Sequence, residues 1–98
     1  MNSKASREFW KLFHSLPLEI QRLTYKNYLL WQNDPRHPSL RFKPVKSGQW
    51  SVRVGDHYRA IGHFVKNDTF LWTWIGTHED LQQTLNEAEP KMILIESV

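Results

Sequence analysis

Two arginines on either side of a short turn are the residues of this sequence best suited to holding a phosphate. Arg53 lies in a run of alternating apolar and polar residues, Gly55-Asp56 starts a tight turn, and Arg59 lies in the next run. A guanidinium binds phosphate oxygens in a fork, so two on one face suit a phosphate that gains charge during reaction. Unrelieved arginines on one face repel, which favours an anion-binding role. The structural alternative is that each arginine pairs with a carboxylate from the acidic C-terminal segment.

Histidine is the side chain whose ordinary pKa suits proton transfer near neutral pH. His78 follows the last expected strand, beside Glu79 and Asp80, where it could act as general acid or base in phosphodiester cleavage. A helix-cap or surface histidine is the alternative. His63 is in register with Arg59, so it is either a residue of the same active face or a hydrogen-bonded core histidine. Structural roles are expected for the other three histidines, His14, His37 and His57.

Motifs for other kinds of chemistry are missing from the sequence. It has no cysteine, which excludes disulfides and thiolate metal sites. No His-Glu-x-x-His pattern, glycine-rich phosphate loop or nucleophile elbow occurs. We therefore expect neither a bound metal nor any other cofactor.

The middle third of the chain is strongly basic, although the net charge is only +3. Residues 36–66 contain seven arginines and lysines against one acid, whereas residues 67–98 contain six acids and one lysine. A basic block of this kind raises the local concentration of a polyanion such as RNA. A solvated surface with scattered charges is the alternative, and the preference for arginine over lysine favours phosphate binding.

Two helices are expected before this basic block. Phe9 and Phe13 recur at helical spacing within residues 7–15. Pro17 then suits the first turn of a second helix, which should run to about Gln32, where an Asn-Asp-Pro sequence ends it. The two segments predict a helical hairpin.

Alternation with period two, typical of strands, replaces the helical period after Pro38. Strands are expected at about residues 40–45, 50–54, 58–65 and 69–75, joined by short turns. Thr77 would then cap a helix over residues 79–87, and residues 91–95 would form a final strand or an apolar tail. The predicted fold is a single α+β domain over residues 1–98, with the hairpin packed on an antiparallel sheet of three to four strands and a short C-terminal helix.

Neither a membrane span nor an apolar secretion signal is evident. No apolar run approaches the roughly 20 residues that a spanning helix needs, and residues 1–7 are polar and charged apart from Met1 and Ala5. We expect a cytoplasmic protein with no membrane partner.

An ordered set of short segments resembles the RelE/ParE superfamily of bacterial toxins, over about residues 7–86. The segments are Leu16-Pro17, Asp34-Pro35, Pro38-Ser39-Leu40-Arg41-Phe42-Lys43, Trp50-Ser51-Val52-Arg53-Val54-Gly55, Tyr58-Arg59-Ala60-Ile61 and Trp74-Ile75-Gly76-Thr77-His78. The resemblance implies the microbial RNase-like fold and the toxin of a type II toxin–antitoxin pair. It also implies a small acidic antitoxin as partner, whose segment would cover the basic face.

The resemblance further implies a metal-independent mRNA endonuclease that acts in the ribosome. Arg59 matches the family's arginine after the hairpin turn, and Arg53 is similar to a basic residue on the preceding strand. His78 falls where several members place a catalytic histidine or arginine. Contacts with RNA are implied for Arg41, Lys43, Lys46, Ser51 and His63.

The sequence departs from the family pattern at one point. Many active members have a tyrosine shortly after the position of His78, whereas no aromatic residue occurs from Gly76 to Val98. The general acid is therefore unassigned. Two alternatives share the fold, namely a ParE-like inhibitor of DNA gyrase that cleaves no RNA and a degenerate domain kept for antitoxin binding. The arginines together with His63 and His78 favour the ribonuclease.

Overall fold

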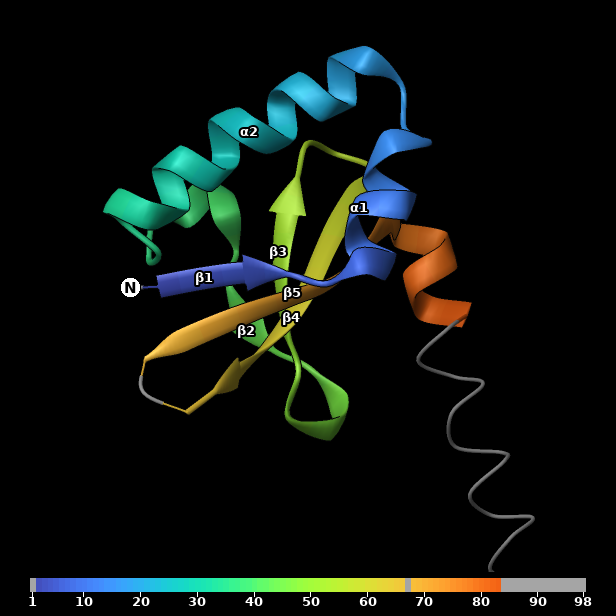
Figure 1. The fold of residues 1–98 in the computed structure, drawn as a ribbon. Helices are drawn as coiled ribbons and strands as arrows, with labels where there is room; N and C mark the ends of the chain where they lie inside the picture. Colours follow the sequence, from blue (N-terminus) through green and yellow to red (C-terminus); the bar gives the residue numbers. More distant parts are fainter. Residues whose placement is uncertain (1, 67, 84–98) are drawn as a thin grey trace, which may run out of the picture.

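A five-stranded sheet forms one layer of the molecule, and two helices cover one of its faces (Figure 1). The computed structural model describes residues 2–66 and 68–83. The helices are α1 (Arg7–His14) and α2 (Leu18–Asn33). The strands are β1 (Asn2–Ala5), β2 (Lys43–Pro44), β3 (Trp50–Val54), β4 (Tyr58–Val65) and β5 (Thr69–Thr77). Their spatial order is β1-β5-β4-β3-β2.

Both predicted helices are confirmed, with bounds close to the expected ones. The side chain of Ser6 caps α1 by accepting a hydrogen bond from the backbone N of Phe9 at 3.1 Å. Pro17 precedes α2 with a φ of −55°, a value that its ring fixes and that suits a helix start. The helices meet at a ring contact between Phe13 and Tyr25, whose centroids are 5.5 Å apart.

The antiparallel hairpins β3–β4 and β4–β5 are also as predicted. The sheet as a whole is mixed rather than antiparallel, because β1 pairs in parallel with β5, with Asn2 opposite Thr69 and Ala5 opposite Trp72 (Figure 1). No strand was expected there. The segment is polar and has no apolar alternation, so backbone pairing and the 2.6 Å contact between the hydroxyls of Ser3 and Tyr28 hold it instead.

The strand expected at residues 40–45 is much shorter than predicted. Pro38–Leu40 forms a 3₁₀ turn, and Arg41 has a left-handed φ of 47°, which breaks an extended chain. Only Lys43–Pro44 pairs with β3, and Pro44 has no N–H to continue the ladder. Leu40 is fully buried, so its apolar character serves the core rather than a strand face.

The core lies between the helices and the facing side of the sheet. The largest fully buried side chains are Trp31, Phe70, Leu40, Ile75 and Val54. Trp31 of α2 lies at the centre, with its ring centroid 5.0 Å from that of Trp72 and 5.4 Å from that of Phe70. Since α1 and α2 both pack on this side, the opposite face of β3 and β4 is left free of them.

The described chain ends in a helix over residues 78–83. The hydroxyl of Thr77 accepts a hydrogen bond from the backbone N of Asp80 at 3.1 Å, so Thr77 is the predicted cap. The rest of the predicted helix, to residue 87, and the strand or tail expected at residues 91–95 lie outside the described residues. Within residues 2–66 and 68–83, no helix has both the length and the apolar character to cross a membrane.

Candidate functional site

Arg53 and Arg59 occupy directly opposite positions on β3 and β4. Their neighbours Val52 and Ala60 are likewise opposite each other and are buried under the helices, so the two arginines project from the other face. Side chains that face each other in this way have their β-carbons about 4.5–5.5 Å apart. The predicted placement of the pair therefore agrees with the register, while its chemical role stays a prediction.

The turn between the two strands holds both guanidinium groups. Arg53 donates from Nε to the carbonyl oxygen of Gly55 at 3.1 Å and forms an ion pair with the carboxylate of Asp56. Arg59 donates from Nη1 to the carbonyl oxygens of Tyr58 at 2.7 Å and of Gly55 at 3.4 Å. Gly55 has a left-handed φ of 68°, which glycine adopts without strain.

Positive charge is in excess at this turn. Burial lowers the pKa of Arg59 from its ordinary value, and the charges of Arg53 and Arg41 lower it further, while Asp56 opposes them. Arg53 pairs with Asp56 of its own turn. The acids of the C-terminal segment beyond residue 83 lie outside the described residues, so the alternative pairing with them stays open. Among residues 2–66 and 68–83, Arg59 has hydrogen bonds to carbonyl oxygens and no ion pair. Arg59 thus lies near the charges of Arg53, Arg41 and Asp56, and among the described residues Asp56 forms its ion pair with Arg53. This excess of guanidinium groups favours binding of an external anion.

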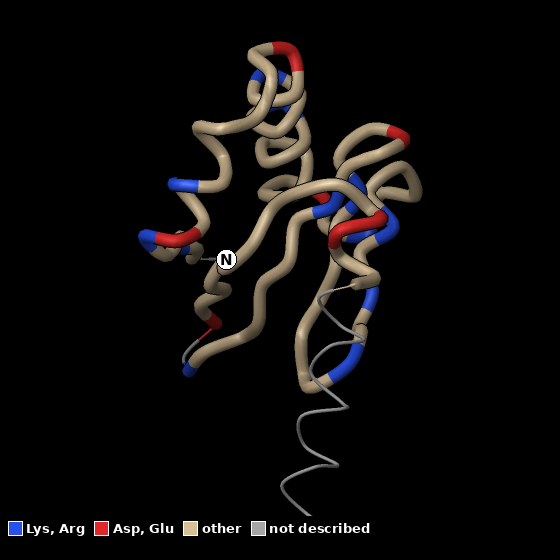
Figure 2. Tube along the Cα trace, turned by 90° about the vertical axis from the view of Figure 1, so that its right-hand side faces the viewer, with Lys and Arg blue, Asp and Glu red and all other residues tan. Residues whose placement is uncertain are grey.

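Basic residues extend this surface along the sheet. Figure 2 shows Lys and Arg positions gathered at one side of the molecule, apart from the charges on α1 and α2. Lys43 of β2 is exposed and lies opposite Ser51, on the face that carries Arg53. Lys46 lies in an exposed 3₁₀ turn, Lys46–Gly48. Ser51 itself is only 4% exposed, which leaves little of it for contact with RNA.

His63 lies further along the same face. It is four residues beyond Arg59 on β4, or about 13 Å at the usual rise of a strand, and it is half-buried opposite Leu71. The Arg59 guanidinium is also bonded to the carbonyl oxygens of Gly55 and Tyr58, on the side away from His63. The predicted role of His63 in RNA binding would therefore concern a neighbouring nucleotide.

His78 lies at the same end of the sheet as the arginine pair. Gly76 is opposite Arg59, Thr77 is opposite Tyr58, and His78 follows as an exposed residue at the start of the last helix. Its backbone N donates to the carbonyl oxygen of His57 at 2.8 Å. The structure thus brings His57, for which a structural role was expected, next to His78.

The described residues offer no ready metal site. No group of three or more histidines, cysteines, aspartates or glutamates within residues 2–66 and 68–83 could hold an ion. The chemistry that the site can perform with its own side chains is therefore anion binding by the arginines and proton transfer by the histidines.

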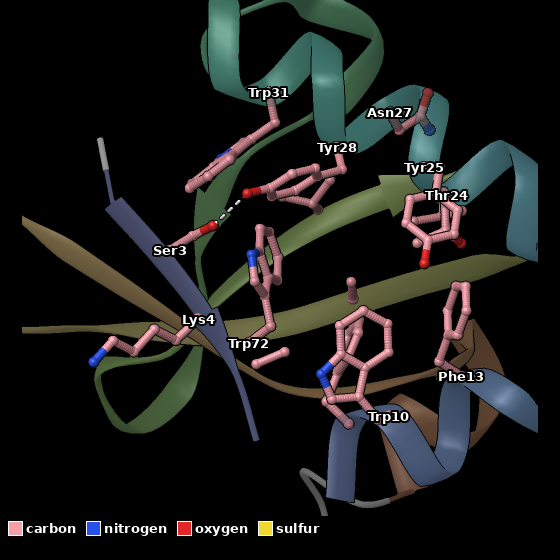
Figure 3. Close-up of a pocket in the computed structure, with 15 residues that line it drawn as sticks. Ser3, Lys4, Trp10, Phe13, Thr24, Tyr25, Asn27, Tyr28, Trp31 and Trp72 are labelled. Carbon is pink, nitrogen blue, oxygen red and sulfur yellow. Dashed lines mark hydrogen bonds between the residues drawn. The ribbon is translucent and has the colours of Figure 1, made fainter. Parts of the chain in front are cut away.

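An apolar groove lies on the helix side of the sheet, away from the arginines. It encloses about 190 Å³ between β1, α1 and α2, and Figure 3 shows the side chains that line it. Trp10 and Tyr25 are part of its lining and are 39% and 54% exposed. The buried Nε1 atoms of Trp31 and Trp72, also in the lining, have no hydrogen-bond partner in the described part of the chain. This groove is thus an incompletely packed edge of the core.

Comparison with known proteins gives a result for structure only. No protein-family model matches the chain, and no curated protein matches it by sequence. The YoeB/ParE toxin from Agrobacterium tumefaciens is similar in structure, with a TM-score of 0.64 at 13% identity over 80% of this chain and 99% of that one. A chain of the RelB-RelE antitoxin-toxin complex from Methanococcus jannaschii has a TM-score of 0.64 at 19% identity, over 82% of this chain and 95% of that one.

YafQ from E. coli strain BL21(DE3) is also similar, with a TM-score of 0.60 at 19% identity over 82% of this chain and 96% of that one. These likenesses span most of both chains in each comparison. They establish that the chain has the RelE-like α+β fold, as the sequence resemblance implied.

Proposed function

We propose that this chain is the toxin of a type II toxin–antitoxin pair and that it cleaves mRNA in the ribosome. The observation that carries the proposal is the opposed pair Arg53 and Arg59, with Arg41 nearby and Asp56 paired with Arg53. The fold supports it, because toxins of such pairs have the same fold. Fold alone does not assign chemistry, so the arginine site is the stronger support.

In the proposed reaction the two arginines hold the phosphate at which the RNA is cut. The 2′-hydroxyl of the preceding nucleotide attacks the phosphorus, and the phosphate oxygens gain charge in the transition state. Fixed guanidinium groups stabilise that charge because they are already aimed at it before the reaction starts. Arg53 and Arg59 are fixed by hydrogen bonds to the turn, and His78 exchanges a proton with the reacting oxygens.

The proposed partner is an acidic antitoxin that uses both surfaces described above. Its acidic residues would neutralise the arginine face, and its apolar side chains would fill the groove between β1, α1 and α2. Charge complementarity supports this choice, because residues 2–33, which supply most of the groove, contain five bases and two acids.

Expression of the chain without an antitoxin tests the function. We expect early arrest of translation and cuts in mRNA that are positioned by codon. Arg59→Ala should abolish the cuts while the protein still folds, because Arg59 is half-buried and makes no side-chain ion pair in the described chain. Arg22→Ala is the matched control, since Arg22 is exposed on α2.

Two other results would contradict the proposal. Gyrase–DNA adducts with translation intact at early times would identify a gyrase inhibitor. Harmless expression of the wild-type chain would identify a domain that only binds an antitoxin.

A further inference from the structure

The backbones of His57 and His78 meet at the end of the β4–β5 ladder. Tyr58 and Thr77 form the last paired positions, and the hydrogen bond from His78 N to His57 O, 2.8 Å long, extends the pairing by one residue. His57 ends the turn between β3 and β4 and His78 begins the last helix, so the two side chains branch from adjacent backbones. Both histidines are exposed, so both imidazoles are accessible to a bound substrate.

The two histidines are also close to the arginine pair in the sheet. His57 lies in the turn that follows Asp56, two residues before Arg59, and Arg59 is opposite Gly76, two residues before His78. Phosphate-binding groups and proton-transfer groups therefore meet at one end of the sheet. The aromatic residue that would supply an acid after His78 is missing from the sequence.

We propose that His57 is a second catalytic residue and forms a general acid–base pair with His78. This inference rests on the proposed ribonuclease function. It assigns the proton donor that the sequence pattern leaves open. One neutral and one protonated imidazole is the combination that acid–base catalysis needs.

The reaction balances with this pair and without any further reactant. The neutral imidazole takes the proton from the 2′-hydroxyl while the 2′-oxygen forms its bond to phosphorus. The bond from phosphorus to the 5′-oxygen breaks, and the protonated imidazole gives its proton to that oxygen. The products are a 2′,3′-cyclic phosphate and a free 5′-hydroxyl, and the two histidines have exchanged protonation states.

Charged residues adjoin the pair along both elements that carry it. On the hairpin these are Asp56, Arg53 and Arg59, and on the last helix they are Glu79 and Asp80. Because carboxylates and guanidinium groups act in opposite directions on an imidazole, the pH dependence must be measured on variants that leave all five in place.

The test compares mRNA cleavage across pH by the wild-type chain and by His57→Gln, His78→Gln and His14→Gln. We expect a bell-shaped profile for wild type, as an acid and a base acting together produce. Each of the first two changes should slow cleavage by roughly 10²- to 10⁴-fold and remove a different limb of the bell, with RNA affinity unchanged. His14 is an exposed histidine on α1, so its change should have no effect.

Failure of the proposed histidine pair and failure of the proposed ribonuclease function give different results. If His57→Gln keeps the wild-type rate and profile while wild type cleaves, the pair is wrong and the ribonuclease stands. If wild type cleaves nothing, both fail. NMR of the imidazole rings gives an independent readout: His78→Gln should shift the ring signals of His57, whereas His14→Gln should not. An unshifted His57 would overturn the pairing.

Discussion

Two partners hold the guanidinium of Arg53, and one of these partners is a carboxylate. Gly55 accepts from Nε, and Asp56 forms an ion pair with the outer nitrogen. Asp56 is 77% exposed, so its carboxylate is hydrated and easily exchanged for another anion. In the proposed function it occupies a guanidinium position that a phosphate oxygen would otherwise take. The aspartate would then compete with the RNA while it keeps Arg53 in place.

Asp56→Asn should strengthen binding of a short RNA by up to roughly fivefold, because an exposed ion pair contributes about 0.2–1 kcal/mol. The measurement is the dissociation constant at fixed salt concentration. Asp68→Asn is the control, since Asp68 is exposed in the β4–β5 turn and asparagine tolerates its left-handed φ of 58°. Weaker binding by the Asp56 variant would mean that the carboxylate chiefly orients Arg53.

Arg59→Gln should raise the free energy of unfolding at low salt by about 0.5 kcal/mol, the usual range for changes outside the core. The pKa of Arg59 is lowered by burial and by Arg53 and Arg41, so folding opposes its protonation. The charge on Arg59 therefore lowers the stability of the folded protein. This loss is present in full at neutral pH and is relieved only as pH rises through the folded-state pKa. Urea unfolding at low and high salt measures it. A gain that persists at high salt would contradict a charge effect.

The elements that the sequence predicts well are those with one apolar and one polar side. The alternation in β3 and β4 placed Arg53 and Arg59 on one face, because the short turn between the strands leaves little freedom of register. The strand β1 has no such alternation and is stabilised by contacts with distant residues, so no local pattern indicates it.

Which residue lies opposite His57 depends on an irregularity in the pairing of β4 with β5, between Ile61 and Gly62. One extra residue of β5 enters the ladder there, so residues beyond it cannot be matched by counting from the turn. The pairing of His57 with His78 therefore follows only from the structure.

Gly62→Ala should destabilise the protein by about 1–3 kcal/mol, as overpacking in a filled core does. A β-carbon at Gly62 would collide with the carbonyl oxygen of Leu71 and the ring of Phe70. At Gly76 the collision is with the ring of half-exposed Trp74, which can move, so Gly76→Ala should cost less. Equal losses in urea unfolding would show that the backbone contact at Gly62 is relieved by movement of the strand.

On the scale of the whole molecule, the arginine face and the apolar groove lie on opposite sides of the sheet. A single partner that covers both must wrap around an edge. Salt would weaken the partner's contact with the arginine face and would have little effect on its contact with the apolar groove.

Tyr25→Asp should weaken binding of the proposed antitoxin by tenfold or more while RNA cleavage is unchanged. A half-exposed aromatic in a groove is typical of a residue that dominates an interface, with a loss of about 2 kcal/mol or more. Leu29→Asp is the matched control, since Leu29 is 62% exposed on the same helix but does not line the groove. Binding can be measured by calorimetry, and an equal effect of both changes would place the contact outside the groove.

The parallel pairing of β1 with β5 bears on the order in which the protein acquires its structure during synthesis. The two strands are the first and the last of the sheet to leave the ribosome, so the sheet cannot close until nearly all of the described chain has been made. Pairings between such distant segments give a high contact order, which slows folding. The hairpin that carries the arginines is local and can form earlier. A nascent chain would therefore display its arginine-bearing turn before it has a finished core.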